Sequence, residues 1–171
     1  MRKTAGFTLI ELVIVIVILG ILGAVAAPRL FNLQGDAYGA NLNALKSSIS
    51  TSMTMANAKA QIQGKFVVSG EDDANSITGY EGIQFVAGYP AALTNADTNK
   101  PPAGILATLE ELDSARYTMG AADGVLTITP VAATNPATCA VTYKEATAAD
   151  TSINPATPAE PAKVVAVTTG C

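Results

Sequence analysis

The sequence predicts an α+β fold in which a long N-terminal helix packs against a C-terminal antiparallel β-sheet. Three observations support this fold class. Residues 7–27 form an apolar run, residues 28–62 continue it as an amphipathic helical pattern, and residues 63–171 change to short β-prone runs separated by turn residues. The expected organisation is therefore one helix in two chemically different halves, followed by a β-rich head.

The apolar run from Phe7 to Ala27 is long enough to cross a membrane. At about 1.5 Å per helical residue it spans roughly 30 Å, the thickness of a bilayer core. Arg2 and Lys3 precede the run. Because positive flanking residues stay on the cytoplasmic side, we expect the N-terminus in the cytoplasm and the head on the outer side of the membrane.

Glu11 is the one charged residue of the run before Arg29. A carboxylate inside a lipid-soluble segment costs about 2 to 3 kcal/mol unless it finds a partner. Thr8 and Glu11 match the S/T-x-x-E pattern of a capping box, and Phe7 is placed to pack on Leu12 as a hydrophobic staple. A capping box explains a glutamate at a helix start, but not its tolerance in lipid. We therefore expect a positive group near Glu11.

Two simpler interpretations of the run stay open. A secretory signal peptide would have its small-residue cleavage site at Ala24-Val25-Ala26, and a soluble secreted binding domain would then begin at Ala27. Against this, the run exceeds the usual h-region of about 7 to 15 residues, and Glu11 interrupts its start. A permanent membrane anchor requires only the length.

Residues 28–62 keep the helical period. One face is apolar: Tyr38, Leu42, Leu45, Ile49, Met53, Ala56 and Ala60. The opposite face is polar and almost uncharged: Asn43, Ser47, Ser50, Thr54 and Asn57. Pro28 lacks a donor and predicts a kink, and Gly20 weakens its turn by about 1 kcal/mol relative to Ala. The stretch between Gly20 and Pro28 is the part of the helix that should melt most easily.

The head, residues 63–171, should build an antiparallel sheet on the second half of the helix. Its β-prone runs cover residues 65–70, 82–90, 124–131, 139–147 and 163–171. A further helix is expected over residues 101–115, with Pro at its start and leucines on one side. The acidic stretch 70–76 and the Ala, Thr and Pro-rich stretch 148–161 are interpreted as solvated loops.

Composition argues against an enzyme and against a nucleic-acid partner. The chain has 171 residues and no His, so a His-built zinc site or a His-dependent catalytic centre cannot form from it. We expect no cofactor and no metal. From residue 63 onward, five Lys and Arg face twelve Asp and Glu, a balance that repels phosphate backbones.

Cys139 and Cys171 are the two cysteines of the chain. On the outer side of a membrane, such a pair is most economically a disulfide, whereas free thiols need a reducing compartment. The bond would close the final hairpin and contribute roughly 3 to 4 kcal/mol in the chain-entropy model.

The N-terminal residues carry a family resemblance. Gly6, then Phe7-Thr8-Leu9-Ile10-Glu11, then an apolar helix, resembles the class III leader of type IV pilins. The resemblance implies that residues 1–6 are a prepilin leader, that prepilin peptidase cuts between Gly6 and Phe7, and that the new Phe7 amine is N-methylated. It implies that Glu11 pairs with the Phe7 amine of a neighbouring subunit, and that the stretch from Gly20 to Pro28 unwinds in the filament.

The resemblance also implies a location and partners. The precursor would lie in the bacterial inner membrane and then enter an extracellular helical homo-oligomer, with the pilus assembly machinery and an unknown surface receptor as partners. The disulfide-bounded region 139–171 resembles the D-region of these pilins. The stretches "APRLFNLQGDA" (27–37) and "GYPAA" (88–92) look similar to mannose-sensitive haemagglutinin pilins, which implies a major subunit that serves attachment. A minor pilin and a type II secretion pseudopilin remain alternatives.

Overall fold

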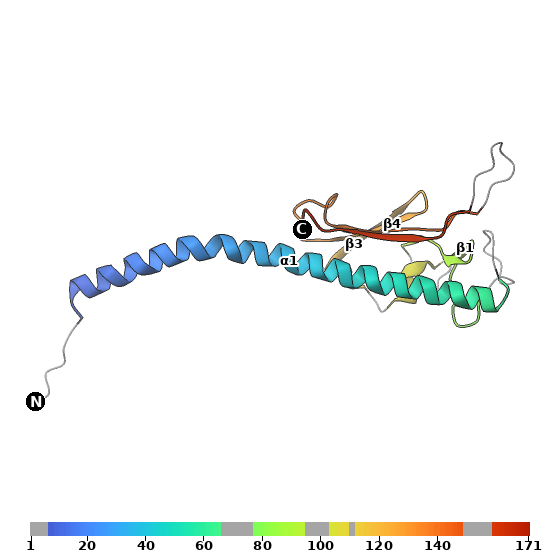
Figure 1. Cartoon of the computed structure of the whole chain (residues 1–171), viewed down its shortest axis with the longest axis horizontal. Coiled ribbons are helices and arrows are strands. Elements are labelled where there is room, and N and C mark those ends of the chain that lie inside the picture. Colours follow the sequence, from blue (N-terminus) through green and yellow to red (C-terminus); the bar gives the residue numbers. More distant parts are fainter. Residues whose placement is uncertain (1–6, 66–76, 95–102, 110–111, 149–158) are drawn as a thin grey trace, which may run out of the picture. The chain divides into compact units, whose positions relative to one another are not determined.

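The computed structural model describes residues 7–65, 77–94, 103–109, 112–148 and 159–171, with backbone only for residues 28–32. It has the predicted α+β layout: a long helix α1, Leu9–Ile62, followed by an antiparallel sheet (Figure 1). The chain divides into two compact units, Met1–Ala37 and Tyr38–Cys171, which are described separately below. The predicted strand at 65–70 and the loop 70–76 lie almost wholly outside the described residues, as does most of the loop 148–161.

The first unit consists of the N-terminal part of α1. Its backbone stays helical through residues 20–28, and the large apolar side chains described between Phe7 and Val25 are exposed within this chain. Candidate Cβ atoms built at Gly20 and Gly23 meet nothing within 4 Å. Glycine is therefore not required there for packing within this chain, although it weakens the helix. The Pro28 side chain and the predicted kink lie outside what is described.

The C-terminal end of α1 is closed by a Schellman motif. Gly64 adopts a left-handed φ of 66°. The Lys65 amide donates to the Ala60 carbonyl at 2.9 Å, and the Gly64 amide donates to the Gln61 carbonyl at 3.1 Å. These two bonds satisfy carbonyls that a helix end would leave free, and a residue without Cβ takes the left-handed position without strain.

The main sheet has four antiparallel strands in the order β3-β4-β5-β6. They are β3 (Tyr117–Ala122), β4 (Val125–Pro130), β5 (Ala140–Lys144) and β6 (Lys163–Val167). The sequence predicted β4, β5 and β6. Along β4, buried and partly exposed residues alternate, as expected for a strand with one face in the core. Within the second unit, Figure 1 shows the sheet running alongside the C-terminal part of α1.

Helix and sheet share one core. Leu42 and Ile49 from α1 meet Leu126, Ile128 and Tyr143 from the sheet, and all five are fully buried. The apolar face predicted for the helix is thus the face that packs. The hydroxyl of Tyr143 donates a short hydrogen bond to the Pro90 carbonyl, at 2.5 Å, in this interior. Desolvation raises the pKa of Tyr143 above its usual range, because burial penalises the phenolate.

A strand that the sequence analysis missed is β3. Its residues, Tyr-Thr-Met-Gly-Ala-Ala, lack the β-branched run that marks a strand, but they pair in register with all of β4. The turn between them is Asp123-Gly124, with φ values of 51° and 71°. Asp-Gly with two positive φ values matches a type I′ hairpin turn, which is a strong sequence signal for two paired strands. The Asp123-Gly124 dipeptide is therefore the sequence signal from which β3 could have been predicted.

Two predicted elements are wrong in form. The run 82–90 is not one strand but a small hairpin of β1 (Phe85–Val86) and β2 (Tyr89–Pro90), turned at Ala87-Gly88 with positive φ at both residues. The helix expected over 101–115 is, in its described part, a single 3₁₀ turn from Ile105 to Thr108.

The short 3₁₀ turn has a physical reason. The amide of Ile105 donates to the Ala91 carbonyl, and the carbonyl of Ala103 accepts from the Gln84 amide, so this backbone is committed to its neighbours. Leu109 is already extended, with φ −102° and ψ 161°. Tertiary pairing therefore outweighs the helical pattern of the leucines.

Asn57 also differs from its predicted place. The sequence pattern places it on the polar face opposite the packing face, but the residue is only 9% exposed. Its side-chain amide donates to the Gly88 carbonyl at 3.0 Å, and its own oxygen accepts from Gln61 at 2.6 Å. A buried amide with both ends bonded anchors the β1–β2 hairpin to α1.

Candidate functional site

The carboxylate of Glu11 is held by the threonine that begins the helix. Thr8 donates both its backbone amide, at 2.8 Å, and its hydroxyl, at 2.7 Å, to Oε2 of Glu11. In return the Glu11 amide donates to the Thr8 hydroxyl at 3.3 Å. These three bonds are the reciprocal pattern of a capping box, so this sequence prediction is confirmed.

The predicted hydrophobic staple is absent. Phe7 is 92% exposed and Leu12 is 60% exposed, so the contact between these two side chains that a staple requires is not made. The described residues therefore leave the side chain of Phe7 almost fully exposed.

The two oxygens of Glu11 differ in their partners. Both donors of Thr8 go to Oε2, and no bond to Oε1 is found among the described residues. An ionised carboxylate accepts several hydrogen bonds through its two oxygens. The cap therefore fixes the orientation of the carboxylate while leaving one oxygen able to receive a further donor.

The helix that carries this carboxylate is apolar on all sides. Leu9–Ala27 has a mean hydropathy of 3.0 and no buried share within the chain, and by length and composition it could cross a membrane. A soluble domain rarely exposes an apolar surface of this extent without a partner. The surface fits insertion into lipid or burial against other helices.

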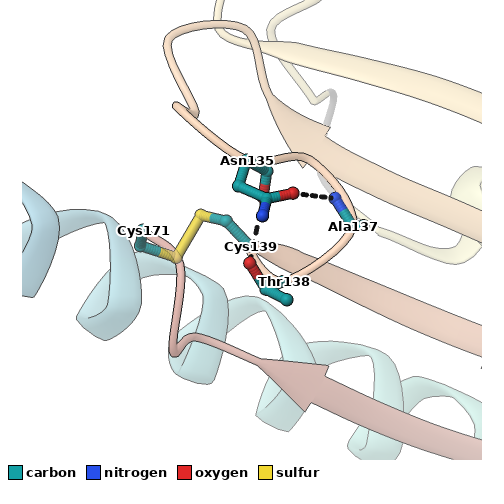
Figure 2. Close-up of a disulfide and its surroundings, with 5 residues drawn as sticks. All are labelled: Asn135, Ala137, Thr138, Cys139 and Cys171. Atoms are coloured by element: carbon teal, nitrogen blue, oxygen red, sulfur yellow. Dashed lines mark hydrogen bonds between the residues drawn. A yellow bond between two sulfur atoms is a disulfide. The ribbon is translucent and has the colours of Figure 1, made fainter.

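The disulfide predicted from the cysteine pair is formed. Cys139 directly precedes β5 and is fully buried, and Cys171 lies 4.8 Å from it between Cα atoms. Figure 2 shows this bond beside the turn of Asn135, Ala137 and Thr138, where the Asn135 side chain accepts from the Ala137 amide at 3.2 Å. The bond ties the segment after β6 to the start of β5.

Backbone pairing supports the same junction. The Gly170 amide donates to the Thr138 carbonyl at 3.0 Å, and a Cβ on Gly170 would come within 1.8 Å of the Thr138 hydroxyl. Only glycine fits this close approach. The disulfide thus secures a segment that is already docked by hydrogen bonding.

No chemistry-bearing cluster accompanies these features in the described part of the chain. No group of three His, Cys, Asp or Glu side chains there lies close enough to hold a metal ion. A groove of about 530 Å³ runs beside α1, and the side chains that line it are hydroxyl or aliphatic: Leu45, Ser47, Ser48, Thr51, Ser52, Thr108, Leu109 and Leu112.

The N-terminal segment matches a known family model. Residues 1–27 match the model of the prokaryotic N-terminal methylation motif. The chain carries this motif. The matched residues include Gly6, Phe7 and Glu11, so the capped carboxylate and the exposed phenylalanine described above both lie within it.

A curated relative extends this similarity. Over 59 residues the chain is 44% identical to the type IV narrow pilus major component of Thermus thermophilus, which covers 34% of this chain. The chain spans about half the length, 51%, of that relative. No solved structure matches the chain significantly. The chain therefore carries a prokaryotic N-terminal methylation motif and is similar, over part of its length, to a major component of a type IV pilus.

Proposed function

We propose that this chain is the major structural subunit of an extracellular type IV pilus that serves surface attachment. The observation that carries the proposal is the combination, within one matched motif, of an exposed Phe7 and a Glu11 carboxylate with one oxygen that receives no hydrogen bond from the described residues. A cut after Gly6 would make Phe7 the chain terminus. Its amine, N-methylated, is then a cation of the kind that the free oxygen requires.

Pairing between copies resolves the cost of the charge. A lone carboxylate in an apolar segment costs about 2 to 3 kcal/mol, and a buried charge is tolerated when it is paired and hydrogen-bonded. The Phe7 amine of a neighbouring subunit supplies the charge, and Thr8 supplies the remaining hydrogen bonds. Assembly of the filament core and neutralisation of Glu11 are then the same event.

The rest of the chain is assigned accordingly. Residues 1–6 are the leader removed by prepilin peptidase, 7–27 the membrane and filament-core helix, 28–62 the amphipathic helix, and 63–171 the head with the disulfide-bounded region 139–171. The precursor crosses the inner membrane with its N-terminus in the cytoplasm, and the assembly machinery extracts it. Gly20 to Pro28 is the segment we expect to unwind on packing.

The attachment role and the subfamily rest on less extensive similarity. The stretches 27–37 and 88–92 look similar to mannose-sensitive haemagglutinin pilins, and the relative from Thermus thermophilus is named a major component. A minor pilin or a type II secretion pseudopilin has the same fold and a different copy number. A sheared surface preparation dominated by this chain supports the major subunit, and its absence there rejects that role.

The deciding measurement is the mature N-terminus. Mass spectrometry of protein sheared from cells should find a chain that begins at N-methylated Phe7. A chain that begins at Ala27 lacks both Phe7 and Glu11, and it would establish a secreted domain released after a signal peptide. An uncut chain retained in membranes would establish a permanent anchor.

Two matched variants separate the charge of Glu11 from its capping role. Glu11→Gln keeps a side-chain oxygen for the Thr8 donors but removes the charge, whereas Thr8→Val keeps the charge and removes the hydroxyl. We expect Glu11→Gln to stay in the membrane with few or no filaments, and Thr8→Val to assemble better than Glu11→Gln. Normal assembly of Glu11→Gln contradicts the pairing.

A further inference from the structure

The four-stranded sheet ends in two strands whose outer edges are not paired with any described residue. Native proteins usually protect such edges with charged residues, proline, a bulge or very short strands. Strand β3 has none of these: it is uncharged, lacks proline and pairs without a bulge over all six residues. Strand β6 carries one charge, Lys163, followed by Val-Val-Ala-Val.

The exposed backbone groups can be assigned from the ladder. The Val131 amide donates to the Arg116 carbonyl, which fixes the alternation of hydrogen-bonded pairs between β3 and β4. The amides and carbonyls of Met119 and Ala121 therefore point away from β4, toward the free edge of β3. The Glu145 amide donates to the Gly124 carbonyl, which fixes the same alternation between β4 and β5. Continued from β5 to β6, this alternation directs the amides and carbonyls of Val164 and Ala166 to the free edge of β6.

The two edges are complementary in direction. All three strand pairs of the sheet are antiparallel, so β3 and β6 run in opposite directions. A second copy shifted sideways across the strands therefore brings its β6 antiparallel to β3 of the first copy. The resulting contact is heterologous, and because it leaves one edge free on each side it can be repeated from copy to copy.

Charge supports this arrangement. Asp123 follows β3 and Lys163 begins β6; both are exposed, and the described residues hold neither in an ion pair. Antiparallel pairing that sets Gly120 opposite Val165 sets Ala122 opposite Lys163, which brings Asp123 beside that lysine. Opposite charges then lie at the same end of the contact.

We propose that β3 of one copy pairs antiparallel with β6 of a second copy of this chain, so that the sheets of neighbouring subunits join edge to edge. The inference rests on the proposed function, because a filament supplies identical copies at close range. It goes beyond contact through the apolar helix, since it assigns a second contact to the heads. Exposed Val165 and Val167, at 39% and 36%, flank this edge and would gain cover from the new strand.

A cysteine pair tests the contact directly. A Cβ on Gly120 meets nothing within 4 Å, so cysteine fits there, and Val165 is exposed on the same face of the sheet. Within one copy these positions are three strand spacings apart, about 14 Å, which is beyond the reach of a disulfide. Gly120→Cys combined with Val165→Cys should therefore give a ladder of linked subunits on non-reducing gels after mild oxidation.

The matched control keeps one cysteine and moves the other. Gly120→Cys combined with Thr54→Cys, on the exposed face of α1, should give no ladder. The ladder can be read on sheared filaments and on full-length chain held in membranes. A Gly120–Val165 pair that gives no ladder in assembled filaments overturns the inference but leaves the proposed function intact. If the unaltered chain makes no filaments, the proposed function fails, and a ladder or its absence in membranes still decides the edge contact.

A proline variant tests the same contact without new cysteines. Ala121→Pro removes an amide that points to the free edge and leaves the ladder with β4 intact, because proline is tolerated at such edge positions. Ala121→Thr is the control, since it keeps that amide. We expect Ala121→Pro to reduce sheared filaments about tenfold relative to Ala121→Thr, as loss of one interface hydrogen bond with added steric conflict weakens each contact by that order. Equal yields of the two variants, with equal thermal stability, contradict the pairing.

Discussion

Removal of the Cys139–Cys171 bond should destabilise the head by about 4 kcal/mol. The two cysteines are 32 residues apart in sequence, and the chain-entropy model gives about 4 kcal/mol for a loop of this length. This is a large share of the 5 to 15 kcal/mol that typically stabilises a domain. The cleanest perturbation is the double variant Cys139→Ala with Cys171→Ala, which leaves no free thiol.

A second double variant measures the cost of polarity at the buried end of the bond. Cys139 is fully buried in the shared core, whereas Cys171 is only partly buried. Cys139→Ser with Cys171→Ala places a hydroxyl in this core, which adds about 1 to 3 kcal/mol if the hydroxyl finds no partner. We therefore expect the serine variant to be less stable than the alanine variant.

Denaturant unfolding of the full-length chain in detergent measures both effects. The chain has no Trp, and its five tyrosines all fall within the unit Tyr38–Cys171, so tyrosine fluorescence reports on the head and its part of α1 alone. A loss below about 1 kcal/mol in the alanine variant would refute the reasoning. Such a result would mean that the hydrogen bond from Gly170 to Thr138 docks this segment without help.

Three further substitutions probe the fold. Tyr143→Phe leaves the Pro90 carbonyl without its buried donor and should cost about 1 to 3 kcal/mol in denaturant unfolding. Because burial raises the pKa of Tyr143, the folded state binds the phenol proton more tightly than the unfolded state does. The free energy of unfolding should therefore be fully present below about pH 10 and fall as the pH rises further. Tyr143→Phe should weaken this alkaline loss of stability, and an unchanged pH profile would contradict the role assigned to Tyr143. Gly124→Ala forces a Cβ onto a positive φ of 71° and to 2.8 Å from the Glu145 carboxylate, so we expect a loss of about 1 to 2 kcal/mol, whereas an unchanged melting temperature would reject the strained turn. Ile49→Ala opens a cavity in the shared core and should cost about 2 to 5 kcal/mol; a loss below 1 kcal/mol would show that α1 does not depend on this contact.

The sequence predicted the elements whose signal is periodic and local. The apolar face from Leu42 to Ala60 packs as its spacing indicates, and β4, β5 and β6 lie within their predicted runs. The capping box and the disulfide were also predictable, because each depends on two residues with a known chemical relation.

The elements that were missed depend on pairing with other elements of the fold, although the Asp123-Gly124 turn is a local signal for β3. Strand β3 contains Gly120 and three alanine or threonine residues, and it is a strand because β4 pairs with it after the Asp123-Gly124 turn. The expected helix near residue 105 is replaced by backbone hydrogen bonds in which the Ala91 carbonyl accepts from Ile105 and the Gln84 amide donates to Ala103, and no local pattern predicts these bonds. Asn57 is buried for the same reason, since the Gly88 carbonyl that it satisfies belongs to another element.

The capping box changes how the charge of Glu11 should be understood. A cap alone would be equally well served by glutamine, so the cap gives no reason for an ionised group in an apolar run. Conversely, without the cap the Glu11 side chain would occupy several rotamers and would have to be ordered each time an ion pair forms. With Oε2 already bonded twice to Thr8, the orientation is set before any second copy arrives. In the proposed pairing with the Phe7 amine of a second copy, the cap lowers the ordering cost, so that capping and pairing reinforce one another instead of competing.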